Sequence, residues 1–74
     1  MDRATLQSVL TRTDERLAQA QQLIAHQREI VADLASFGLD ARRAMKALVV
    51  FEQMLEAHFA ERDELVLLMQ KASA

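Results

Sequence analysis

Apolar residues recur at intervals of seven over two long stretches of the chain. Leu10, Leu17, Ile24 and Val31 form one such column in the first stretch. This spacing is typical of helices that pack along their whole length, so we predict a helix over about 3–36. The two columns beside it are Val9, Leu23, Ile30 and Phe37, interrupted by Arg16, and Leu6, Ala20 and Leu34, shared with Thr13 and Gln27.

The second stretch predicts a helix over about 40–71. Its apolar residues alternate at intervals of three and four, which places them along one seam of a helix. The seam comprises Ala41, Ala44, Leu48, Phe51, Leu55, His58, Arg62, Leu65 and Met69. It is flanked by Met45, Phe59 and Val66 on one side and by Ala47, Met54 and Leu68 on the other.

A turn at 37–40 separates the two stretches and holds the only glycine of a chain without proline. Gly38 suits the left-handed position that ends a helix. Leu39 can fold back on Leu34, and Asp40 is a good cap for the second helix. So short a connection predicts an antiparallel helical hairpin, and the alternative is one unbroken helix running through Gly38.

The start of the first helix has two candidates. Asp2 is a good N-terminal cap, but Thr11 or Thr13 followed by Asp14 and Glu15 would serve as well. Residues 1–12 and 72–74 are therefore expected to fray.

Charges favour folding about Gly38. Pairs four residues apart within each helix are mostly of like sign, which weakens an isolated helix. Folding the chain about Gly38 brings residues of opposite charge to the same level of the hairpin. We predict that these charges favour the antiparallel orientation of the helices, and we call them the orientation code. The expected groups are Glu29 and Asp33 with Arg42, Arg43 and Lys46, and Arg12 and Arg16 with Glu61 and Glu64.

Composition limits the remaining classes. The 74 residues, rich in helix formers and lacking cysteine, predict a single all-α domain over 1–74 without disulfides or thiolate chemistry. A net charge of −2 predicts no nucleic-acid partner and no attraction to an anionic membrane. We find no signal-peptide pattern and no apolar run of membrane-spanning length, so the expected location is the cytoplasm.

Two helices cannot cover stripes this wide, and exposed apolar area on that scale marks an interaction surface. The simplest partner is a second copy, giving a homodimer with the form of a four-helix bundle, a relative of the coiled coil. A higher assembly, or a monomer that binds another helical protein, remains as an alternative. The expected partner surface is Val49, Val50, Phe51, Val66, Leu67, Leu68 and Met69.

His58 and Arg62 stand where the seam should hold leucine. With Asp63 and Glu15 they could form a small ligand site that responds to pH through His58, or they could be a polar layer that sets register. His26 with Glu29 and His58 with Glu61 could each offer two metal ligands, but their order differs from that of bundle metal sites. We find no nucleophile beside a histidine and carboxylate, and no phosphate loop, so we expect neither an enzyme nor a cofactor.

The pattern Gln27-x-x-Ile30-Val31-x-x-Leu34-x-x-x-Gly38-x-Asp40, then Ala44-x-x-x-Leu48-x-x-Phe51, then His58-x-x-x-Arg62-Asp63-x-Leu65 resembles a group of short alphaproteobacterial proteins. The resemblance covers about 15–68. It implies a helical hairpin in a bacterial cytoplasm, without assigned activity, and gives His58, Arg62 and Asp63 weight as a distinctive polar set.

The leading hypothesis is a non-enzymatic, self-associating hairpin that acts as a structural or regulatory interaction module. The alternative is a small sensor bundle that uses the polar set.

Overall fold

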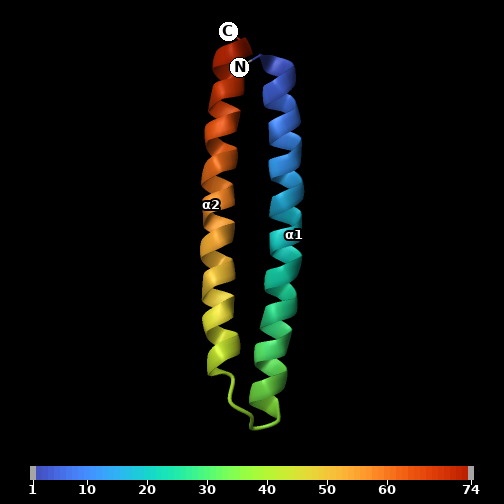
Figure 1. Ribbon diagram of the computed structural model, residues 1–74, viewed down its shortest axis with the longest axis vertical. Coiled ribbons are helices and arrows are strands. Elements are labelled where there is room, and N and C mark those ends of the chain that lie inside the picture. Colours follow the sequence, from blue (N-terminus) through green and yellow to red (C-terminus); the bar gives the residue numbers. More distant parts are fainter. Residues whose placement is uncertain (1, 74) are drawn as a thin grey trace.

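The computed structural model describes residues 2–73, which form two long helices joined by a short turn. Helix α1 spans Arg3–Ser36 and helix α2 spans Arg42–Ser73. They lie side by side and antiparallel, so that the start of α1 and the end of α2 meet at one end of a rod (Figure 1). The predicted all-α hairpin is confirmed. Neither helix, within the described residues, contains a stretch apolar enough to cross a bilayer.

Helix α1 begins at Arg3 rather than near Thr13. The Asp2 carboxylate accepts a hydrogen bond from the Thr5 N–H at 2.7 Å, which satisfies one of the unpaired donors of the first turn. This bond lowers the pKa of Asp2 below its ordinary value. The hydroxyls of Thr11 and Thr13 instead donate to the carbonyls four residues earlier, at 3.0 and 2.9 Å. Both threonines therefore lie inside a continuous helix, and the alternative start is wrong.

The turn closes α1 with a Schellman arrangement. Gly38 has a φ of +69°, in the left-handed region that favours glycine. Its N–H donates to the Ala35 carbonyl at 3.1 Å, and the Leu39 N–H donates to the Leu34 carbonyl at 2.9 Å. These two bonds satisfy carbonyls that the end of the helix leaves unpaired.

Helix α2 begins two residues later than the predicted residue 40. Asp40 therefore lies before the capping position, which Ala41 occupies by accepting the Met45 N–H at 2.8 Å. Asp40 still acts on the helix start, because its carboxylate accepts the Arg42 backbone N–H at 3.0 Å and pairs with the Arg42 guanidinium at 2.8 Å. At its other end α2 continues to Ser73, so 72–73 are helical; residues 1 and 74 lie outside the described residues.

Asp40 gives the start of α2 a predictable response to pH. The Arg42 side chain, and then its backbone N–H, lower the pKa of Asp40 below 3.8. A lowered folded-state pKa means that the contribution is present above the unfolded value and is lost as pH falls through the folded value. Asp40→Asn should therefore melt at a lower temperature than the native protein at pH 6, and the difference should narrow as the pH falls below the ordinary aspartate value of about 3.9. Circular dichroism melts from pH 6 down to pH 2 test the prediction; a difference that stays constant over this range would contradict it.

The core is a thin seam between the helices. Residues Leu6, Leu17 and Ile24 of α1 and Leu65 of α2 are buried hydrophobic residues. The predicted α2 seam is confirmed, since each of its nine residues is half-buried or buried: Ala41, Ala44, Leu48, Phe51, Leu55, His58, Arg62, Leu65 and Met69. Most of them keep an exposed side, because a single neighbouring helix covers only one face of each side chain.

Candidate interaction surface

Each helix has two flanks beside its seam, and one ion pair shows which flanks lie on the same side of the rod. Arg28 follows the seam residue Gln27, Glu52 follows the seam residue Phe51, and the two charged groups lie 3.8 Å apart. Residues that come directly after a seam position in the sequence therefore lie on the same side of the rod in both helices. Residues that come directly before a seam position lie on the opposite side of the rod in both helices.

On the side formed by residues that precede seam positions, each helix carries one mainly apolar column. Leu23, Met54 and Leu68 are exposed over 44%, 50% and 41% of their surface. We call this surface the apolar flank; it comprises Val9, Leu23 and Ile30 of α1 and Ala47, Met54 and Leu68 of α2. Two exposed charged residues, Arg16 and Glu61, occupy the same columns and interrupt it.

The opposite side is mixed in character. Helix α2 contributes Met45 and Phe59, both exposed. Helix α1 faces them with polar side chains in the corresponding column, namely Asp14, Gln21 and Arg28. We call this surface the mixed flank. Only the apolar flank therefore continues across both helices, as a surface that excludes water must.

The predicted partner surface is divided by the fold. Val49 and Leu67 are exposed but lie away from the apolar flank, since Val49 adjoins Met45 and Leu67 is on the back of α2. Val50 and Leu68 do adjoin or belong to the apolar flank. The remaining three residues are half-buried, and two of them are seam positions: Phe51, Val66 and Met69.

The polar residues of the seam pair across the helices or along one helix. Arg62 donates to the Asp14 carboxylate at 2.7 Å, joining α2 to α1. His58 Nδ1 lies 3.9 Å from a Glu61 carboxylate oxygen one turn further along α2. Asp63 and Glu15 are both exposed, and among the described residues no hydrogen bond or ion pair joins either of them to Arg62 or His58. The four residues expected to form one site therefore do not come together: Arg62 pairs with Asp14 of α1, and His58 pairs with Glu61 within α2.

The expected orientation code is wrong in its partners. Within residues 2–73, no ion pair joins Glu29 or Asp33 to the basic start of α2, or Arg12 or Arg16 to the acidic part of α2. Arg42 is held instead by its near neighbour Asp40. Two other charge pairs, Arg28–Glu52 and Arg62–Asp14, connect the helices. The antiparallel direction agrees with the code, but long side chains in the seam or directly beside it make the actual contacts.

Two further polar residues take seam positions that a leucine pattern would not suggest. The Gln27 side-chain amide donates to the Ala44 carbonyl at 2.9 Å, from one helix to the other. It therefore differs from the other glutamines of α1, which are exposed. Thr13 is 1% exposed, and its hydroxyl is satisfied by the Val9 carbonyl. In the sequence, the feature that indicates a seam position for both residues is their place in the column of Leu6, Ala20 and Leu34.

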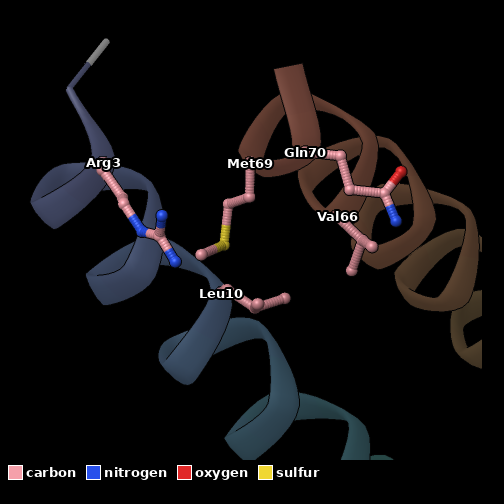
Figure 2. A pocket seen from close by; sticks show the side chains of 5 residues that line it. All are labelled: Arg3, Leu10, Val66, Met69 and Gln70. Carbon is pink, nitrogen blue, oxygen red and sulfur yellow. The ribbon is translucent and has the colours of Figure 1, made fainter. Parts of the chain in front are cut away.

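A hollow of about 410 Å³ lies between the helices at the open end of the rod. Figure 2 shows Met69 of α2 reaching toward Leu10 and Arg3 of α1, with Val66 beside them. Gln70 is the polar residue contributed by α2. The lining is mostly hydrocarbon, and His58 and Asp63 are not part of it. This hollow extends the seam rather than forming a site for the polar residues.

The described residues contain no group of three or more histidine, aspartate or glutamate side chains that could hold a metal ion. Comparison of the chain with protein-family models, with curated proteins and with solved structures finds no match. The resemblance to short alphaproteobacterial hairpins stays a prediction.

Proposed function

We propose that this protein is an interaction module that works by self-association, two hairpins forming a four-helix bundle. The observation that carries the proposal is the surface left open by one hairpin. Its accessible area is 5602 Å². A compact monomer of 8.4 kDa would expose only about 4,600 Å². The radius of gyration of 16.9 Å likewise exceeds the roughly 11 Å of a compact chain of 74 residues.

A second copy removes this excess. Two separate hairpins expose about 11,200 Å², whereas one compact protein of twice the mass exposes about 7,700 Å². The difference, about 3,500 Å², falls within the range of obligate homodimers. An added helix pair would also complete the burial of the half-exposed seam residues. The area and the shape both support a partner that is itself a rod of this length.

The module has no need of catalytic chemistry under this proposal. Arg62 and Gln27 have partners on the other helix, which supports a role in aligning the helices, whereas His58 pairs along α2. A polar layer at seam positions gives up some stability in exchange for a defined register. The outer faces of the bundle would then present the remaining charged residues to further partners.

Sedimentation equilibrium of the native protein between about 1 and 100 µM tests the proposal. We expect a single species of twice the chain mass, with thermal stability that rises with concentration, because a dimer gains stability by mass action. A folded species of single-chain mass throughout this range would overturn the proposal. A larger, concentration-dependent series of masses would also contradict a closed two-fold bundle.

A further inference from the structure

Two charged residues within the apolar flank define how two hairpins can meet. Arg16 precedes the seam residue Leu17, and Glu61 precedes the seam residue Arg62. The Asp14–Arg62 bond of 2.7 Å joins the helices at this height of the rod. Arg16 and Glu61 therefore lie at nearly the same level, one on each helix, on the side that lacks Asp14. They form a single charged layer within two columns that are otherwise apolar.

We infer that the hairpins associate through their apolar flanks with both Gly38 turns at the same end of the bundle, so that Arg16 of each copy pairs with Glu61 of the other. This inference rests on the proposed self-association. It adds the face that is used, the direction of the second copy and the charged layer that selects this direction.

Only two arrangements bring the apolar flanks of two identical rods together with two-fold symmetry. In the first, the axis runs along the rod, so every level is preserved and α1 of one copy meets α2 of the other. Arg16 then faces Glu61, Leu23 faces Met54, Ile30 faces Ala47 and Val9 faces Leu68. Each apolar residue meets an apolar residue, and each charge meets its opposite.

In the second arrangement, the axis crosses the rod, so the turns lie at opposite ends and α1 meets α1. Levels are then reversed, and the flank residue opposite Arg16 is Leu23. Placing a charge against a leucine removes its water without providing a partner, which is costly. Sliding the copies until the layers coincide does not help, because Arg16 would then meet Arg16 and Glu61 would meet Glu61. The charges therefore disfavour this arrangement at either register.

Single spin labels distinguish the two arrangements. The native chain has no cysteine, so Gln22→Cys and Ser36→Cys each provide one label on the exposed face of α1. Gln22 lies near the middle of the rod and should give a short label-to-label distance in either dimer. Ser36 lies beside the turn. If the two hairpins point in opposite directions, the two Ser36 labels would be separated by roughly 45–50 Å along the bundle axis.

Pulsed electron paramagnetic resonance measures the label-to-label distance in the Gln22→Cys dimer and in the Ser36→Cys dimer. We expect the Ser36 and Gln22 label distances to be similar, both below about 40 Å from bundle spacing and helix diameter. A Ser36 distance longer than the Gln22 distance by tens of ångströms would overturn the inferred direction. No dipolar coupling at Gln22 would mean that no dimer forms, and then the proposed function fails rather than the direction.

Mixing two charge variants tests the layer itself. Arg16→Glu and Glu61→Arg each place like charges together in a homodimer, whereas a mixed dimer pairs opposite charges at both positions. In an equimolar mixture, native mass spectrometry should show a ratio of mixed dimer to homodimers about fivefold or more above the statistical ratio, since each exposed pair changes affinity by a factor of a few. A statistical mixture would contradict the inferred pairing.

Discussion

Met54→Glu should leave the hairpin monomeric at concentrations where the native protein is dimeric, raising the dissociation constant by at least about 1,000-fold. Two-fold symmetry places two new carboxylates in the interface, and each loses water without gaining a partner, at a cost of several kcal/mol. About 4 kcal/mol corresponds to this change in affinity. Met54 is half exposed in the single hairpin, so the substitution should spare the fold of each chain.

Two matched substitutions make this result specific to the apolar flank. Leu67 is exposed over 56% of its surface on the back of α2, and Phe59 is exposed on the mixed flank. We expect Leu67→Glu and Phe59→Glu to retain the native dissociation constant in sedimentation equilibrium. Dissociation by Phe59→Glu, with a dimer surviving Met54→Glu, would assign the interface to the mixed flank instead.

Ile24→Ala should lower the free energy of unfolding by about 2–5 kcal/mol, because it removes three carbons from one of the few buried side chains. Ile24 is 3% exposed and lies in the middle of the seam. The total stability of a 74-residue protein is only about 4–11 kcal/mol. Urea denaturation at a fixed protein concentration measures the loss and keeps the contribution of association constant.

A graded series separates the loss of packing from other effects. Ile24→Val should cost only about 0.5–1.5 kcal/mol. Leu67→Ala, at an exposed position, should change the free energy of unfolding by less than about 0.5 kcal/mol. Equal losses for Ile24→Ala and Leu67→Ala would show that the seam is not the main source of stability.

The seam and the turn were predictable because each depends on local physics. Intervals of three and four follow from helical geometry, and every α2 seam residue is shielded as the spacing indicates. Gly38 takes a positive φ because the chain must leave a helix there, and few other residues do so without strain. The boundary of α2 was less accurate, since Asp40 can reach the Arg42 N–H from one position earlier than a conventional cap.

The cross-helix contacts were harder to predict because they depend on how far flexible side chains reach. The height of each residue along the hairpin, taken alone, suggests Glu29 and Asp33 as partners of the basic residues at the start of α2. The structure instead pairs Arg28 with Glu52, because side chains beside the seam lie closer to the other helix. Because threonine often caps a helix, the sequence offers Thr11 or Thr13 as a start that competes with Asp2. Inside the seam, Thr13 instead satisfies its hydroxyl on the carbonyl of the preceding turn and remains buried.

The candidate surface was predictable in kind but not in place. The sequence indicates more apolar side chains than one partner helix can cover, and the exposed residues agree. It does not indicate which of them combine, because that depends on which flank of α1 lies beside which flank of α2. The Arg28–Glu52 contact supplies this information. It removes Val49 and Leu67 from the surface and brings Val9, Leu23 and Ile30 of the other helix into it.

The start of α1 and the end of α2 lie together at the end of the rod remote from the turn (Figure 1). A pulling force applied between them would therefore act across the helices rather than along them. Contacts would break one layer at a time, starting at the hollow beside Met69 and ending at Gly38. Such unzipping requires a smaller force than shearing the whole seam at once, so a single hairpin should open gradually under tension.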